Sequence, residues 1–251
     1  MIDDYFEYER RLWHETVLPR LRAIGLDLDG RRVLDVGCGH GGMLYGLGES
    51  FAPAEAIGLD LDDEMIAVAA RRAGPRTRFE VRDLFAFADA DGFDAVFLRD
   101  VLEHVVDPAR AFARAFELTR PGGVAFVTYA PFYGPFGGHQ HNGSGLGSHV
   151  PWLQLLPEPL FRRAIRVRGN AYKQRDKLID DVETVLRTRL TLGGFDRLLA
   201  RPDVEVLDRA RYLVRPDYRI KFGLPAVALP PLPTAVAELL CTAEALVLRR
   251  R

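Results

Sequence analysis

The chain has 251 residues, 48% of them hydrophobic, and a formal net charge of −1 at pH 7. This length and apolar content are enough to bury one sizeable core, so we expect one domain. The near-zero charge gives no general electrostatic reason for binding nucleic acid. We expect neither secretion nor membrane spanning, because no basic-then-apolar leader opens the chain and no apolar run approaches about eighteen residues. The two cysteines, Cys38 and Cys241, lie far apart in the sequence, which disfavours a disulfide framework and predicts a protein of the reducing cytoplasm.

Residues 33–42 read Val-Leu-Asp-Val-Gly-Cys-Gly-His-Gly-Gly, so an apolar run that contains Asp35 leads directly into a turn rich in glycine. Glycine tolerates positive φ and has no Cβ, so a ligand can lie against bare backbone amides at the start of the following helix. The pattern predicts a strand, a loop for a nucleoside cofactor and a helix. Such loops also occur in dinucleotide-binding domains and in ordinary tight turns.

Further apolar runs predict four more strands, with helices between them. The second run, 56–59, ends in Asp60, twenty-one residues after Gly39, which places a carboxylate within reach of a ribose diol. The alternation predicts a parallel sheet covered on both faces, with ligands at the carboxyl ends of its strands. The remaining strands are expected at 77–81, 93–98 and 123–130, and the helices at 5–21, 42–50, 63–73 and 107–119.

After the fifth strand the pattern changes. Residues 131–175 are rich in glycine, proline, histidine and aromatic side chains, and they are too long for a simple connection. We expect this segment to form a lid over the active-site end of the sheet. Residues 176–200 predict a helix interrupted at Gly193-Gly194, and 204–214 and 239–249 predict the last two strands, with a proline-containing surface loop between them.

Over roughly residues 30–131, the order and spacing of these motifs resemble the class I S-adenosylmethionine (SAM)-dependent methyltransferases. The family pattern has an acidic residue two before the first loop glycine, another at the end of strand two, an Asp after strand three and a Pro-Gly-Gly turn before strand five. All four features occur here in order, as Asp35, Asp60, Asp83 and Pro121-Gly122-Gly123. The resemblance implies a doubly wound, Rossmann-like α/β fold with a seven-stranded sheet and an antiparallel last strand, and the lid insertion after strand five is a departure from the minimal fold.

The resemblance also implies how the chain is divided and which residues bind the cofactor. The expected parts of the one domain are a helical cap (1–30), a cofactor-binding core (31–130), the lid (131–175) and a closing helix with strands (176–251). Asp60 would accept hydrogen bonds from both ribose hydroxyls, and the residues expected to bind SAM are Asp35, Gly37, Gly39, Gly41, Asp60, Leu61, Asp83, Leu84 and Arg99. A dinucleotide-dependent dehydrogenase fits less well, because it needs a pyrophosphate at the loop and a nicotinamide partner farther on. Each aspartate alone could also be a helix cap.

Asp100, Glu103 and His104 follow the fourth strand at the spacing i, i+3 and i+4, which predicts that they share one face of a helix. Two carboxylates and an imidazole on one face suit a divalent cation. The segment is similar to the Glu-x-x-Glu-His motif that binds magnesium or a related metal in the 3-O-methyltransferases of ubiquinone biosynthesis and in the small-RNA 2′-O-methyltransferases. Asp100, which replaces the first Glu of that motif, has a shorter reach.

The lid offers further ligands, because His139, His141 and His149 are three of the six histidines of the chain. Such oxygen and nitrogen ligands accept Mg²⁺, Mn²⁺, Fe²⁺ or Zn²⁺. The predicted metal ligands are Asp100, Glu103, His104, His139 and His141, and the predicted catalytic residues are His139, His141, Asp100 and His104. The alternative is a metal-free enzyme in which His139 or His141 is the general base.

Other side chains are weaker candidates. Three polar residues of the first helix are candidates to contact the methionine carboxylate of the cofactor or the substrate: Tyr5, Tyr8 and His14. The alternative is a packing helix on which these side chains are solvated. Four rings at the end of strand five and directly after it would line an aromatic pocket or pack inside the lid: Tyr129, Phe132, Tyr133 and Phe136. The basic residues between 162 and 177 would bind an anion or form a solvated face.

The sequence therefore predicts methyl transfer from SAM to a small molecule, with a hydroxyl oxygen as the first candidate acceptor. Metal-free transfer to nitrogen or carbon is the second hypothesis, and a non-catalytic protein that binds the cofactor or a partner is the third. No nucleic acid or membrane partner is expected, and a homo-oligomer is left open.

Overall fold

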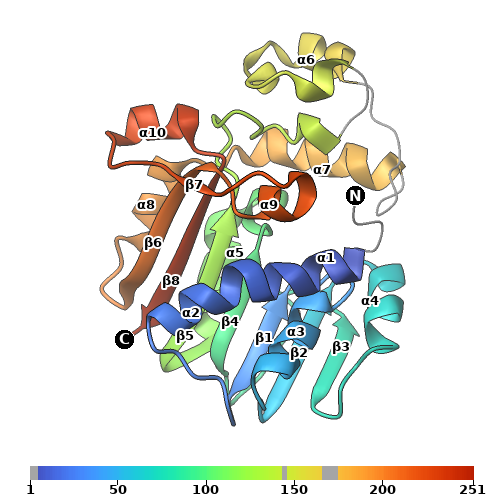
Figure 1. Ribbon diagram of the computed structural model, residues 1–251, viewed down its shortest axis with the longest axis vertical. Coiled ribbons are helices and arrows are strands. Elements are labelled where there is room, and N and C mark those ends of the chain that lie inside the picture. Colours follow the sequence, from blue (N-terminus) through green and yellow to red (C-terminus); the bar gives the residue numbers. More distant parts are fainter. Residues whose placement is uncertain (1–4, 143–145, 166–174) are drawn as a thin grey trace.

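A single mixed sheet forms the centre of the protein (Figure 1). The computed structural model describes residues 5–142, 146–165 and 175–251, and in these ranges eight strands lie in the order β3-β2-β1-β4-β5-β8-β6-β7. Strands β1 to β5 are mutually parallel, and β8 runs antiparallel between β5 and β6. The strands are β1 (Arg32–Val36), β2 (Glu55–Asp60), β3 (Thr77–Val81), β4 (Phe93–Arg99), β5 (Thr119–Tyr129), β6 (Val204–Val214), β7 (Val227–Ala228) and β8 (Ala243–Arg250).

The expected fold class is confirmed, and the structure adds the two-residue edge strand β7 to the expected seven. Neighbouring parallel strands are connected through helices, so both faces of the sheet are covered, as parallel sheets require. The carboxyl ends of β1 to β5 meet at one edge. Figure 1 shows α6, α7 and α9 beyond that edge, at the top of the view. The helices are α1 (Tyr5–Leu12), α2 (Leu18–Ala23), α3 (Gly42–Ser50), α4 (Asp63–Ala70), α5 (Pro108–Leu118), α6 (Glu158–Ala164), α7 (Arg175–Thr188), α8 (Leu192–Leu199), α9 (Asp217–Phe222) and α10 (Thr234–Leu240).

The two faces of the sheet carry separate cores. On one face, Trp13 and Leu44 from the N-terminal helices pack against Phe97 of β4. On the other, Phe112 of α5 and Phe195 of α8 pack against alternate residues of the same strands. Since side chains of a strand point to opposite faces in turn, each central strand contributes to both cores.

The C-terminal third differs from the expectation in two places. The helix predicted over 176–200 ends at Thr188 and restarts at Leu192, not at the two glycines, because Arg189 has a φ of +44° that a helix cannot continue through. The last strand begins at Ala243, and the residues before it form α10. An apolar run of this length fits a helix or a strand, and periodicity alone does not separate them.

Helix α1 lies against α3 in a groove made by glycines. A Cβ on Gly42 would lie 2.1 Å from the carbonyl oxygen of Phe6 and 2.7 Å from Cβ of Glu9, and a Cβ on Gly46 would lie 2.9 Å from the Trp13 ring. Between Trp13 and Val17 (η1) the chain forms a π-helical turn, which leads from α1 into α2. Close packing of the two backbones therefore fixes the position of α1.

We expect Gly42→Ala to destabilise the protein by about 2 kcal/mol, because the new methyl group overlaps backbone that cannot move freely. Gly48 of the same helix has no atom within 4 Å of the Cβ that it lacks, so Gly48→Ala is a matched control. That control is expected to be neutral or stabilising by roughly 0.5 kcal/mol. Urea unfolding of both variants checks this, and equal stability would show that the groove is not required.

Candidate functional site

The glycine loop forms the expected sharp turn between β1 and α3. Gly37 N and Cys38 N both donate to the carbonyl oxygen of Leu59, at 2.7 and 3.0 Å, and hold the loop beside β2. Gly37, Gly39 and Gly41 have φ values of +71°, +55° and +80°. Side chains strain the backbone in this region, and a Cβ at each of the three positions would lie 2.2 to 2.6 Å from a neighbouring side chain, so both effects favour glycine.

The space that the loop glycines leave is partly occupied by side chains of the protein. A Cβ on Gly39 would lie 2.2 Å from Oε1 of Glu9, and a Cβ on Gly41 would lie 2.6 Å from the Phe79 ring. Helix α1 therefore covers the loop and brings Glu9 to it. The absence of side chains at the loop serves the packing of the protein as well as the approach of a cofactor.

Asp60 lies at the carboxyl end of β2 and holds two amides. Its Oδ2 accepts from Gly39 N at 2.9 Å and its Oδ1 accepts from Asp62 N at 3.0 Å. The carboxylate is partly exposed, and it joins the glycine loop to the turn before α4. The structure thus brings the first two predicted cofactor motifs into direct contact.

Three further residues that are predicted to bind SAM follow the ends of β2 and β3. Leu61 is 72% exposed, so one face of its side chain is available to cover a ring. Asp83 is exposed and its Oδ1 accepts from Phe85 N at 2.8 Å. The side chain of Leu84 is buried in the core, which leaves its backbone as the part that a ligand could reach.

Two carboxyl groups are buried beside the loop, on β1 and on α1. Burial raises the pKa of Asp35 to about 7, although the charge of Arg99 opposes the rise. Burial also raises the pKa of Glu9 to about 8, again against the charge of Arg99. The sequence analysis did not single out Glu9. The sequence does contain a sign of its burial, because Glu9 comes three residues after Phe6 and four before Trp13, on the apolar face of the first helix.

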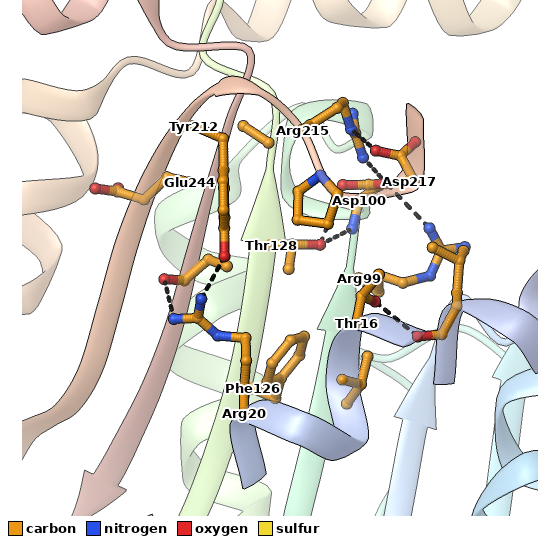
Figure 2. Close-up of a pocket in the computed structure, with 15 residues that line it drawn as sticks. Thr16, Arg20, Arg99, Asp100, Phe126, Thr128, Tyr212, Arg215, Asp217 and Glu244 are labelled. Carbon is orange, nitrogen blue, oxygen red and sulfur yellow. Dashed lines mark hydrogen bonds and ion pairs between the residues drawn. The ribbon is translucent and has the colours of Figure 1, made fainter. Parts of the chain in front are cut away.

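Asp100 lies in an ion-pair network at the end of β4 (Figure 2). Its Oδ2 accepts from Arg99 at 3.0 Å and from Arg215 at 2.6 Å, and its Oδ1 accepts from Thr128 Oγ1 at 3.1 Å. Burial would raise the pKa of this carboxyl, but Arg215 and Arg99 together hold it well below its usual range. Arg215 follows β6, far along the chain, and the sequence analysis missed it because nothing local marks it.

The expectation that Asp100, Glu103 and His104 share one helical face is wrong. Asp100 has a φ of +53°, and only a short 3₁₀ turn, η2 (Leu102–His104), follows it. The turn directs Asp100 to the arginines and the other two residues away from it. A non-glycine residue with positive φ costs energy and is a common feature of functional sites.

Glu103, His104 and His139 come together in a group in which Glu103 and His139 are buried and His104 is partly exposed. One ligand atom from each lies within 4.8 Å of the others, and the two imidazole rings are 4.7 Å apart. Oε1 of Glu103 accepts from Ala130 N at 3.1 Å, and burial raises the pKa of this carboxyl to about 8. His139 has a φ of +55°, so the backbone is strained at His139 as well as at Asp100, three residues before Glu103.

The residues of this group fit a divalent cation. In the part of the chain that the structure describes, Oε2 of Glu103 and Nδ1 of His139 are buried without a hydrogen-bond partner. Buried polar atoms are almost always paired, so such atoms call for a ligand. Burial lowers the pKa of His139, which keeps the imidazole in the neutral form that metals bind. Asp181 Oδ1 of α7 lies 3.7 Å from Nδ1 of His104, where a carboxylate can orient a ligating imidazole.

The other histidines lie in different surroundings. The ring centroid of His141 is 5.7 Å from that of His139, and burial lowers the pKa of His141 to about 3. His149 is exposed, and His14 pairs with Glu49 at 2.8 Å. His141 therefore borders that group, while His14 faces the end of α3.

The remaining candidates are mostly structural. Tyr8 donates to Asp217 at 3.1 Å, and Tyr5 lies over the glycine loop, 3.2 Å from the Cβ that Gly39 lacks. Tyr129 and Phe132 are buried in two different cores, so the four rings do not form one pocket.

Of the basic cluster, Arg162 pairs with Glu158 and Glu183, at 2.8 and 2.9 Å. Arg163 is exposed. The other members fall outside the residues or side chains that the structure describes: Arg166, Arg168, Lys173, Arg175 and Lys177.

A cavity of about 50 Å³ lies beside the Asp100 network, under η1 and against β5 and β8. Figure 2 shows Arg99 and Thr16 on one side of it and Arg20 and Glu244 on the other. Its volume suits a few water molecules. The cavity is therefore too small to hold an acceptor molecule.

The raised pKa values of Glu9, Asp35 and Glu103 make stability depend on pH. Between pH 6.5 and 8 the folded protein retains protons that the unfolded chain has already released, so the free energy of unfolding falls as pH rises. His139 has a lowered pKa and acts in the opposite direction only below about pH 6.5. We expect a loss of ~2 kcal/mol per pH unit near pH 7. Urea unfolding without cofactor and with a chelator measures it, and Asp35→Asn should reduce the slope. Stability that is flat or rises over this range would contradict the expectation.

Comparisons with known proteins agree with the motifs. A family of methyltransferase domains matches residues 5–157. The ubiquinone biosynthesis O-methyltransferase of Aromatoleum aromaticum is 41% identical over 145 residues, which cover 51% of this chain and 60% of that protein. Phosphoethanolamine N-methyltransferase 2 of Caenorhabditis elegans is 32% identical over 127 residues, which cover 48% of this chain and 29% of that protein.

Solved structures share the fold across most of the chain. A SAM-dependent methyltransferase from Mesorhizobium loti has a TM-score of 0.59 and 19% identity, covering 92% of this chain and 96% of its own. The plantazolicin methyltransferase in complex with S-adenosylhomocysteine (SAH) has a TM-score of 0.58 and 14% identity, covering 97% of this chain and 85% of its own. At these identities the similarity establishes the fold alone.

The match to the family spans well over half of the chain, whereas the curated relatives are matched over 60% of their length or less. None of the helices in the described ranges is both long and apolar enough to span a membrane. The glycine loop, the acid at the end of β2 and the family match lead to one conclusion: the chain belongs to the methyltransferase-domain family and is a class I SAM-dependent methyltransferase.

Proposed function

We propose that this protein transfers the methyl group of SAM to a hydroxyl oxygen of a small molecule, with a divalent cation held by Glu103, His104 and His139. The observation that carries the proposal is this group of one carboxylate and two imidazoles, whose ligand atoms lie within 4.8 Å of one another. Glu103 and His104 directly follow β4, which pairs with β1, the strand before the glycine loop. Cofactor and cation would therefore meet at one edge of the sheet.

The residues of the chain would mainly position the reactants. Ala130 N holds one oxygen of Glu103, which leaves the other oxygen for a ligand. Glu103 and His139 are buried, which would limit the access of water to the reacting atoms. A bound divalent cation would lower the pKa of a hydroxyl in contact with it and align its oxygen with the methyl group.

The types of ligand atom also indicate which ion the site would prefer. Mg²⁺ prefers oxygen ligands, whereas two imidazoles with one carboxylate suit Mn²⁺, Fe²⁺ or Zn²⁺. We therefore place these ions before the magnesium that the sequence resemblance suggests. Asp100, a predicted ligand, is engaged by Arg99 and Arg215 and has no place in this set.

Metal-free transfer to nitrogen or carbon is the second candidate, supported by the phosphoethanolamine N-methyltransferase among the relatives. It needs a proton acceptor near neutral pH. Burial lowers the pKa of His141 to about 3, so this side chain is a weak base at pH 7. This favours the first candidate. The cytoplasm as the location and the oligomeric state stay predictions.

The test is SAH formation with catechols, phenols and primary amines as acceptors, after treatment with EDTA and after addition of Mn²⁺ or Mg²⁺. We expect hydroxyl acceptors to be methylated, EDTA to abolish turnover and Mn²⁺ to restore it best. Full turnover in EDTA would refute the metal-assisted mechanism. Turnover with amines alone would support the second candidate.

A further inference from the structure

Glu9 lies where the glycine loop meets the start of α3. Its Oε2 accepts from Gly42 N at 3.0 Å, and its Oε1 is the atom nearest to the Cβ that Gly39 lacks. Asp60 accepts the amide of Gly39 from the other side. Two carboxylates, one from α1 and one from β2, therefore lie on either side of one loop glycine.

The charges around Glu9 do not balance. Glu9 is 2% exposed, and Asp35 beside the loop is equally buried. The cation that faces both is Arg99, whose guanidinium is already paired with Asp100 at 3.0 Å. Buried carboxylates need a paired cation to remain charged. A further positive group next to these two acids would therefore stabilise their charged forms.

We propose that Glu9 is a cofactor-binding residue that pairs with the α-ammonium group of the methionine part of SAM. The inference rests on the family of the chain and on the expected contact of Asp60 with the ribose, and it does not depend on the metal. With the ribose at Asp60, the methionine part extends along the loop toward Gly39 and α1. The α-ammonium is the cationic group common to SAM and SAH, so both ligands would be held in this way.

A purely structural role for Glu9, as a cap of α3, accounts for only part of its contacts. The residue before α3 is Gly41, with a φ of +80° and no side chain, so the amide of Gly42 does need an outside acceptor. One oxygen of Glu9 meets that need. The carboxylate also accepts a hydrogen bond from the backbone of His40, and its Oε1 lies over Gly39, so Glu9 reaches beyond the start of α3 into the glycine loop.

Isothermal titration calorimetry with two ligands tests the proposal. SAH carries the amino acid part, whereas 5′-methylthioadenosine has the same nucleoside and a thioether but no ammonium group. We expect Glu9→Gln to weaken SAH binding by roughly 10- to 100-fold and to leave 5′-methylthioadenosine binding unchanged. Glu9→Asp, which keeps the charge on a shorter side chain, should recover part of the loss.

Glu7→Gln is the matched control, since Glu7 is on the same helix, pairs with Arg10 and is 41% exposed. It should bind both ligands as the wild type does. Equal weakening of both ligands by Glu9→Gln would show that Glu9 only supports the loop. Unchanged or tighter SAH binding would show that Glu9 competes with the cofactor. Either result overturns the proposal, and thermal unfolding of each variant confirms that it is folded.

Proton release gives a second readout. Glu9 has a pKa of about 8, so pairing with an ammonium group at pH 7 should displace its proton. We expect SAH binding by wild type to release about one proton more than binding by Glu9→Gln, measured in buffers of different ionisation enthalpy. Equal release by the two proteins would contradict the pairing. The titratable and charged groups that face Glu9 are Tyr5 on α1, Asp35 on β1, Cys38 in the loop and Arg99 on β4.

Discussion

Replacing Asp60 by alanine is expected to weaken SAH binding by about a hundredfold or more. The carboxylate is the expected acceptor for two ribose hydroxyls, and hydrogen bonds to a charged group contribute about 1.5–3 kcal/mol each. The same carboxylate accepts Gly39 N and Asp62 N, so its loss also releases the glycine loop from β2. Titration calorimetry measures the loss.

The matched control for Asp60 is Asp63→Asn, an exposed acid in the first turn of α4. It removes a charge three residues away without touching the loop, so SAH affinity should change by less than about twofold. If Asp60→Ala bound SAH as the wild type does, the cofactor would have to lie elsewhere on the sheet edge.

Replacing His139 by alanine is expected to lower Mn²⁺ affinity by more than about a hundredfold, because loss of a direct ligand costs more than the 10- to 100-fold typical of residues behind the ligands. SAH affinity should remain, since His139 is in the lid and the loop contacts are on β1 and β2. The Mn²⁺ affinity, measured by titration, and the turnover rate should fall together. His149→Ala, at an exposed histidine in the same segment, is the control.

A metal-free mechanism predicts a different result for the same variants. His139→Ala would then lower turnover with no change in metal content. Glu103→Gln separates the two further, because it removes a charged ligand and leaves the hydrogen bond from Ala130 N to the side-chain oxygen in place. Loss of Mn²⁺ binding in Glu103→Gln supports the metal site, and unchanged binding would contradict it.

The sequence predicted the central strands well, for a physical reason. Each of β1, β2 and β4 is buried on both faces, so its apolar run is continuous and ends where the polar site begins. The glycine loop was equally clear, because three positive φ values and close neighbouring side chains favour glycine at these positions. The family resemblance depends on the same segments and is confirmed.

The sequence did not predict contacts between residues far apart in the chain, or contacts that depend on a positive φ. Asp100 has the spacing of a helical ligand, but its positive φ turns it toward Arg215, which comes from 115 positions farther along the chain. Glu9 reaches the loop only because α1 packs against α3. Both contacts depend on tertiary packing, and no local pattern in the sequence records it.

X-ray diffraction from crystals grown with SAH and Mn²⁺, collected near the manganese absorption edge, tests the proposed site most directly. We predict one anomalous peak per chain, within about 2.3 Å of Glu103, His104 and His139. We also predict SAH at the carboxyl ends of β1 and β2, with its ribose on Asp60. SAH bound there with no peak at the three residues, or with the ion held by other side chains, would contradict the account.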